Sequence, residues 1–130
     1  MPLVKIEIVG PKDEAYKKAV LDGVHEALVH ALKVPVDDRT QRLYVLGPEN
    51  FEYRSGRTDQ FTLIEILLFA GRSKEAKKKL YSRIVENLKE QPGIASKDIL
   101  IVLNEQPLEN WGVHGGKPAD EVDLGFNIKV

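Results

Sequence analysis

Proline at position 2, directly after the initiator methionine, has the most distinctive chemical potential in this chain. If Met1 is removed, Pro2 becomes the amino terminus and carries a secondary amine on a rigid ring. Burial in an apolar pocket disfavours the protonated form of such an amine and lowers its pKa towards neutrality, which suits a general base. The alternative is a structural role alone, because proline is also tolerated at the start of an edge strand.

A strand that would hold this amine in place is predicted directly after Pro2. Over residues 3–9, apolar side chains alternate with the charged Lys5 and Glu7. Most chain ends are mobile, but an amine at the start of a strand is anchored. The sequence therefore offers both a candidate base and an element to position it.

Composition narrows the classes of protein to which the chain can belong. The 130 residues are 42% hydrophobic and 30% charged, which is typical of one folded domain. The net charge is −1, from 19 basic and 20 acidic residues, so the composition favours neither a nucleic acid nor a membrane partner. Cysteine is absent, and no apolar run approaches the length of a membrane span. We expect a soluble cytoplasmic protein.

The three histidines do not suggest a metal centre. His25, His30 and His114 are scattered along the chain, and no carboxylate–histidine spacing matches a zinc motif. His25 shares the helical register of Leu21 and Leu28, so we expect it to be partly buried. His114, in a glycine-rich segment, could approach a ligand. No phosphate-binding glycine loop is found, so we expect neither a metal nor a cofactor.

Two segments of the chain resemble each other at a spacing of about sixty residues. The matches are Gly10, Glu14-Ala15 and Lys17-Lys18 with Gly71, Glu75-Ala76 and Lys78-Lys79, Asp38 with Asp98, Leu43 with Leu103, and Pro48-Glu49-Asn50-Phe51 with Glu109-Asn110-Trp111. Their shared order implies two copies of one structural unit. We expect one domain, 1–130, with repeats at about 2–51 and 61–111 and a carboxyl-terminal arm at 112–130.

Each copy is predicted to form a strand, a helix and a second strand. The expected strands cover 3–9, about 40–46, 61–70 and 99–103, and the expected helices cover about 12–33 and the residues from a cap at Ser73 to about Gln91. A strand-helix-strand unit implies a right-handed crossover and a parallel pair. The predicted fold class is α+β: a four-stranded mixed sheet with two helices on one face, plus a short carboxyl-terminal strand among 122–128.

The strands at 62–69 and 99–103 are apolar on both faces, which is the pattern of strands buried from both sides. Two helices cover one face, and the remaining chain is too short to cover the other. We expect a homo-oligomer, since so large an exposed apolar patch is rare on a monomer. The carboxyl-terminal strand would then lie against a neighbouring subunit.

In the order of these features the chain resembles the tautomerase superfamily, whose members begin with a catalytic amino-terminal proline. The resemblance covers nearly the whole chain, and it is strongest to the long members that resemble malonate semialdehyde decarboxylase. The supporting stretches are Leu21 to His25, Val34 to Gln41, Arg57 to Phe61, Gly71-Arg72, and Pro107 with Trp111. The resemblance implies a homotrimer that acts without a cofactor on a small carboxylate substrate.

The resemblance also implies roles for four residues. Pro2 matches the general acid/base, and Arg72 matches an arginine that grips a substrate carboxylate through its planar guanidinium. Asp38 matches an acidic residue that orients or activates water or substrate, and Trp111 matches part of an apolar wall that keeps the amine dry. Structural alternatives are a solvated Arg72 at a helix start, a turn or cap role for Asp38, and simple packing of Trp111.

One position departs from the decarboxylase pattern. Members of that type carry a second arginine two positions before the first, where this chain has Ala70. Decarboxylation and hydration depend on extra cationic stabilisation, whereas enol–keto tautomerisation of a 2-oxo acid needs only a base and one carboxylate anchor. We expect a tautomerase, an isomerase. The alternatives are a decarboxylase or hydratase of a small 3-oxo or unsaturated acid, and a non-enzymatic oligomeric binding module.

Overall fold

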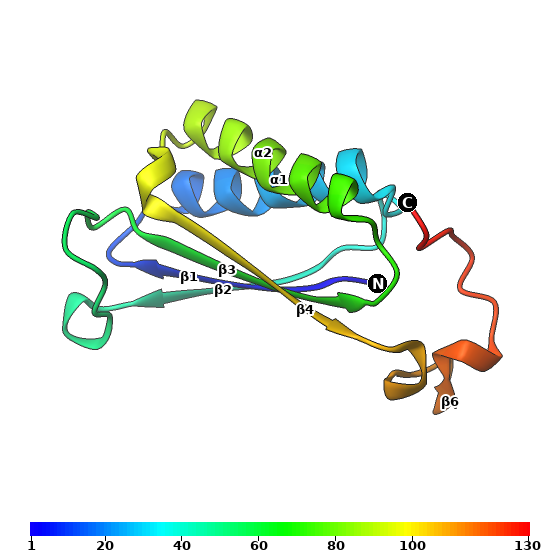
Figure 1. Ribbon diagram of the computed structural model, residues 1–130. Coiled ribbons are helices and arrows are strands. Elements are labelled where there is room, and N and C mark those ends of the chain that lie inside the picture. Colours follow the sequence, from blue (N-terminus) through cyan, green and yellow to red (C-terminus); the bar gives the residue numbers. More distant parts are fainter.

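A four-stranded mixed sheet with both helices on one face forms the body of the protein (Figure 1). The computed structural model describes residues 1–130. The helices and strands in chain order are β1 (Leu3–Val9), α1 (Glu14–Leu32), β2 (Thr40–Leu46), β3 (Thr62–Phe69), α2 (Lys74–Glu90), β4 (Ile99–Gln106), β5 (Gly112–Val113) and β6 (Lys117–Pro118). The strand order is β2-β1-β3-β4, with β1 parallel to β2, β3 parallel to β4, and β1 antiparallel to β3. The predicted α+β class and the mixed sheet are confirmed.

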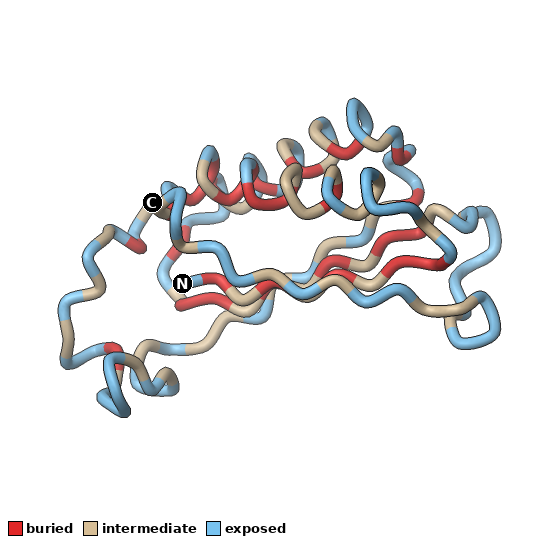
Figure 2. The backbone as a smooth tube through the Cα atoms, turned by 180° about the vertical axis from the view of Figure 1, so that it is seen from behind, coloured by how far each residue is buried: buried red, intermediate tan, exposed pale blue.

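The alternation of side chains along β1 and β3 decides which face of the sheet meets the helices. The side chains of β1 and β3 that pack under the helices are Val4, Ile6, Ile8, Ile64, Ile66 and Leu68. They meet the apolar stripes of the two helices, which include Val24 and Leu28 of α1 and Leu80 and Ile84 of α2. Figure 2 shows this core as buried segments that alternate along the strands and lie on the inner sides of the helices.

Local hydrogen bonds fix where the two helices begin. The Asp13 carboxylate accepts from the Tyr16 amide at 2.8 Å before α1, and the Ser73 hydroxyl accepts from the Ala76 amide at 3.1 Å before α2. Such caps satisfy amide groups that have no partner within the first turn. The cap predicted at Ser73 is confirmed. The first helix begins at Glu14 rather than at residue 12, because Asp13 adopts an extended backbone as its cap.

The two strand-helix-strand units correspond to each other at an offset of 60 residues. The amide of Gly10 donates to Leu46 at the end of one parallel pair, and the amide of Ala70 donates to Gln106 at the end of the other. The short 3₁₀ helices Pro48–Asn50 and Leu108–Asn110 follow at the same offset. The structural partner of Gly10 is therefore Ala70, and the sequence match of Gly10 with Gly71 lies one residue out of register.

The face of the sheet opposite the helices is not covered by this chain. Leu100 and Val102 of β4 are 42% and 46% exposed there, and Tyr44 of β2 is also exposed. Figures 1 and 2 show both helices on one side of the sheet and no element over the other. None of the helices combines the length and the hydrophobicity needed to cross a membrane.

The carboxyl-terminal arm differs from the expectation in where its strands lie. The short strands β5 and β6 form a hairpin at 112–118, whereas residues 122–130 belong to no strand. A strand needs a hydrogen-bonding partner, and residues 122–130 have no such pairing with the sheet of their own chain. The arm is nevertheless tied down, because the amide of Ser73 donates to the Val130 carbonyl at 2.9 Å. Figure 1 shows it returning from the hairpin towards the start of α2.

Candidate active site

The pairing of the strands brings the start of the chain beside the end of β3. Leu3 lies opposite Leu67 in the antiparallel pair and opposite Thr40 in the parallel pair. The amino terminus, the segment before β2 that contains Asp38, and the segment after β3 that contains Arg72 therefore meet at one end of the sheet. Three of the four residues predicted for the site, Pro2, Asp38 and Arg72, come together for this reason.

A cavity of about 210 Å³ lies at this end of the sheet. Its lining residues come from the chain start, the end of β3, the hairpin and the arm: Met1, Asp38, Phe69, Gly112, Val113, His114, Leu124 and Phe126. Most of these side chains are apolar, and the polar groups are the terminal amine, Asp38 and His114. Small-molecule sites commonly combine the two in this way.

The terminal amine lines this cavity and lies beside a carboxylate. Its nitrogen, on Met1, lies 3.4 Å from Oδ2 of Asp38. Burial lowers the pKa of this amine below its ordinary value of 8.0, and the positive charge of Arg72 lowers it further, whereas the Asp38 carboxylate raises it. The net direction is downwards. Pro2 is buried next to Met1, and its nitrogen is the amide nitrogen that Met1 acylates.

Arg72 is a buried cation with spare hydrogen-bonding capacity. It is only 6% exposed, and Nη1 donates to the Phe69 carbonyl at 3.0 Å, whereas Nε is buried without a partner. Burial lowers the pKa of the guanidinium, and the nearby Glu105 carboxylate opposes this effect. A solvated Arg72 at the helix start is thus not what the structure contains. A buried donor without a partner carries a desolvation cost that an anionic ligand would relieve.

Trp111 contributes to the apolar wall through Phe69. The two rings lie edge to face with centroids 4.7 Å apart, and the Trp111 indole donates to the Gln106 carbonyl at 3.3 Å. Phe69 lines the cavity, whereas Trp111 packs behind it. The structure therefore places Trp111 in the apolar cluster of the site and not on the lining itself.

Several lining residues were not assigned to the site from the sequence. Phe69, Val113, Leu124 and Phe126 form the apolar lining. His114, which the sequence suggested could approach a ligand, lines the cavity from the tip of the hairpin. The alternation over 122–128 did mark Leu124 and Phe126 as facing one side. This alternation did not indicate that the arm folds back to the site.

The other histidines have structural surroundings. His25 is 6% exposed, and its Nε2 is hydrogen-bonded to the Val36 carbonyl at 2.8 Å, as expected for a partly buried helix residue. His30 is exposed. No group of three or more His, Asp and Glu side chains is placed to hold a metal ion.

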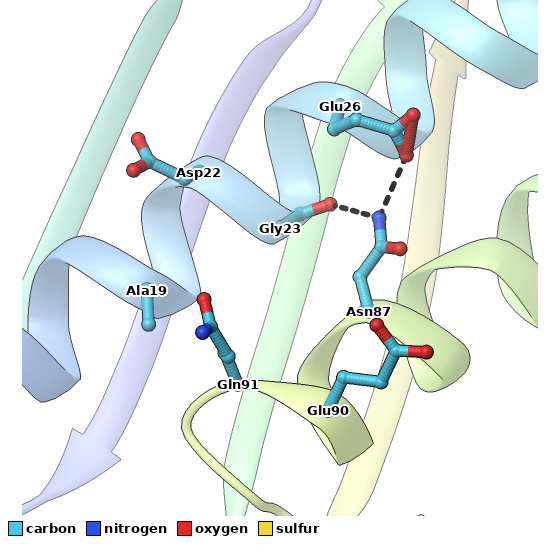
Figure 3. A pocket seen from close by; sticks show the side chains of 7 residues that line it. All are labelled: Ala19, Asp22, Gly23, Glu26, Asn87, Glu90 and Gln91. Carbon is cyan, nitrogen blue, oxygen red and sulfur yellow. Dashed lines mark hydrogen bonds between the residues drawn. The ribbon is translucent and has the colours of Figure 1, made fainter.

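A larger depression of about 350 Å³ lies between the two helices and away from the terminal amine (Figure 3). Its wall is mostly acidic and amide groups: Ala19, Asp22, Gly23, Glu26, Asn87, Glu90 and Gln91. Asn87 donates to the Gly23 carbonyl and to Glu26, which Arg83 also contacts at 2.7 Å. These bonds lower the pKa of Glu26 to about 2. The groups tie the helices together, and none is a nucleophile or base poised for chemistry.

Comparison with known proteins relates the chain to one family of enzymes. Two family models, both described as tautomerase enzyme, match residues 38–114 and 2–43. The probable tautomerase YusQ of Bacillus subtilis (strain 168) is 26% identical over 122 residues, which cover 90% of this chain and 96% of that protein.

Two solved structures share the fold. A crystal structure of FG41 malonate semialdehyde decarboxylase inhibited by 3-bromopropiolate superimposes with a TM-score of 0.82 at 27% identity, covering 94% of this chain and 98% of that one. A fused 4-OT symmetric trimer superimposes with a TM-score of 0.80 at 24% identity, covering 91% and 96%. At this identity, the similarity to the fused 4-OT structure shows a shared fold and nothing about function.

Replacement of Asp38 by Asn tests the electrostatics of this end of the sheet. Because the carboxylate favours the charged amine, its removal should lower the pKa of the terminal amine further. NMR titration of the amino-terminal residue measures the change. Asp37→Asn is the matched control, since Asp37 is the exposed neighbour, and it should leave the titration nearly unchanged. An equal effect of both variants would show that Asp38 has no specific contact with the amine.

Proposed function

The chain belongs to the tautomerase family, and we propose that it interconverts the enol and keto forms of a small 2-oxo acid, with Pro2 as general acid and base once Met1 is removed. The observation that supports this best is the meeting of the amino terminus, Asp38 and the buried Arg72 beside an apolar cavity. Met1 forms part of the lining of that cavity. Its removal would free the Pro2 nitrogen and leave room for a substrate.

The proposed reaction moves one proton from oxygen to carbon. Neutral Pro2 takes the proton of the enol hydroxyl, and the O–H electron pair becomes part of the new C=O bond. The electrons of the C=C bond then take the proton from the Pro2 ammonium and form a C–H bond, so that the amine is regenerated. Burial lowers the pKa of the Met1 amine at this end of the sheet. The same surroundings would keep a useful fraction of the Pro2 amine neutral near pH 7 after Met1 is removed.

Arg72 is proposed to hold the carboxylate of the substrate. Its Nε has no partner, and a guanidinium matches a carboxylate in shape and charge. The same charge would stabilise the oxyanion that develops at the neighbouring oxygen. Asp38 is proposed to orient the amine, and Trp111 to support the Phe69 ring that excludes water.

A decarboxylase or hydratase is the alternative reaction. The likeness to malonate semialdehyde decarboxylase and the close approach of Asp38 to the amine favour it, whereas Ala70 in place of a second arginine does not. Release of carbon dioxide from malonate semialdehyde would distinguish it from tautomerisation. A non-enzymatic module is not supported, because both family models describe tautomerase enzymes.

We also propose that the protein assembles as a homotrimer through the uncovered face of the sheet. That face exposes Leu100, Val102 and Tyr44, and the fused 4-OT relative forms a symmetric trimer. Burial of these side chains against a second copy would remove apolar surface from water. We propose further that residues 1–130 form one domain made of the two repeats and the arm.

Replacement of Pro2 by Ala should strongly reduce tautomerase activity while the fold is kept. Alanine still supplies an amino-terminal amine, but the secondary amine and the ring that fixes it are lost. The measurement is kcat/KM towards the enol of phenylpyruvate, with intact mass to verify that Met1 has been removed from both proteins. Undiminished turnover by the variant would exclude Pro2 as the base.

Replacement of Arg72 by Ala should lower kcat/KM, because Arg72 is proposed to stabilise negative charge as a buried oxyanion donor does. The expected loss of transition-state stabilisation is about 2–4 kcal/mol. Lys12→Ala is a matched control, because Lys12 occupies the position 60 residues earlier and donates to the Val9 carbonyl at 2.8 Å as Arg72 does to Phe69. The control should retain activity. Similar losses in the two variants would indicate a structural role for both.

Replacement of Val102 by Asp should dissociate the oligomer, because it places a charge on the proposed interface. Sedimentation velocity at micromolar concentration would show the wild type as a trimer and the variant as a smaller species. Ser82→Asp, on the exposed side of α2, should leave the trimer intact. A monomeric wild type would contradict the assembly proposed here.

A further inference from the structure

We propose that the cavity beside the amino terminus selects monocarboxylic 2-oxo acids with an apolar tail over dicarboxylic ones. This inference rests on the function proposed above and adds the class of substrate. It follows from the uneven distribution of charged and apolar groups around the cavity.

Two charged groups of the lining lie together, where the head of the substrate would bind: the terminal amine is 3.4 Å from Asp38. The terminal amine and Asp38 are part of the lining there, and Arg72 lies close enough to lower the pKa of that amine. Arg72 is the one buried cation near the amine, and the Glu105 carboxylate already offsets part of its charge. Arg72 could bind one carboxylate, and this chain offers a second carboxylate no further buried cation.

Apolar groups make up most of the remaining lining, and the tail of the substrate would lie against them. Val113 comes from the hairpin, and Leu124 and Phe126 come from the arm, all three in one cluster with Phe69. A carboxylate placed against them would lose its hydration without gaining a partner. A phenyl or branched alkyl group would instead be removed from water, which is favourable.

His114 does not provide a favourable site for a second carboxylate. It is the other lining side chain that can carry a positive charge, but it is exposed at the hairpin tip. Water and salt screen a charge in that position, so it offers a second carboxylate little compensation for lost hydration.

The apolar wall is held in place by the body of the protein. The arm is anchored at its end by the hydrogen bond from Ser73 to Val130 and by Ile128, which is buried in the same cluster as Phe69. The cavity of about 210 Å³ is equivalent to roughly seven waters, and removal of Met1 would enlarge it. A compact aromatic or branched tail fits this space.

Three enols that share one head group and differ in the tail test the proposal. They are 2-hydroxy-2,4-pentadienoate, 2-hydroxymuconate, which adds a terminal carboxylate, and the enol of phenylpyruvate, which carries a ring. With the processed full-length protein, kcat/KM for each monoacid should exceed that for the diacid by about tenfold or more. A wild type that prefers the diacid would overturn the proposal while leaving the tautomerase function intact.

Phe126→Arg supplies the missing cation and should raise the diacid-to-monoacid ratio of kcat/KM by about tenfold. Asn127→Arg is the matched control, because Asn127 is the exposed neighbour on the alternating arm, and it should leave the ratio unchanged. Equal ratios in the two variants would overturn the proposal. Leu124→Arg serves the same purpose if Phe126→Arg does not fold.

A binding measurement separates this proposal from the proposed function. NMR shift titration with 3-phenylpropanoate and with adipate, neither of which can tautomerise, should show tighter binding of 3-phenylpropanoate. If the protein converts none of the three enols but binds 3-phenylpropanoate more tightly than adipate, the tautomerase function is rejected and the selectivity is kept. Equal or tighter binding of adipate would reject the selectivity.

Discussion

The antiparallel pairing of β1 with β3 is the constraint on which the site depends. It sets Leu3 opposite Leu67, so the amino terminus lies where β3 ends and the chain turns into α2. Arg72 follows that strand directly, and the parallel pairing of β1 with β2 brings Asp38 to the same place. A one-residue slip of β1 against both neighbouring strands would turn its side chains to the other face of the sheet and disturb the contact of the terminal amine with both groups.

Because the unit is duplicated, the sheet has two equivalent ends, one at the amino terminus and one near Phe61. The end near Phe61 is filled by aromatic side chains. At the other end, Phe61 occupies the position 60 residues after Met1 and is buried against Phe51, with ring centroids 5.6 Å apart. Asp98, the counterpart of Asp38, is hydrogen-bonded to Thr58 instead of to an amine. A chain has a single amino terminus, so the second end has aromatic packing where the first has a reactive group.

The sequence was sufficient for elements whose signals are local. Alternation predicted β1, and the Ser73 cap and the expected end near Gln91 agree with the bounds of α2. It was insufficient where the outcome depends on distant contacts. The alternating residues after 121 were predicted to be a strand, but no edge of their own chain pairs with them, and Leu124 and Phe126 line the cavity instead. Likewise, no local pattern indicated that Arg72 would be buried.

The proposal that Pro2 acts as the base is tested most directly by two titrations of the processed protein. One follows the ¹⁵N resonance of Pro2 with pH, and the other follows kcat/KM for a reactive enol. If Pro2 is the base, kcat/KM rises as the amine loses its proton, and both curves report one pKa below that of an ordinary chain end. An amine that titrates like an exposed chain end, with kcat/KM indifferent to its ionisation, would contradict a catalytic role for Pro2.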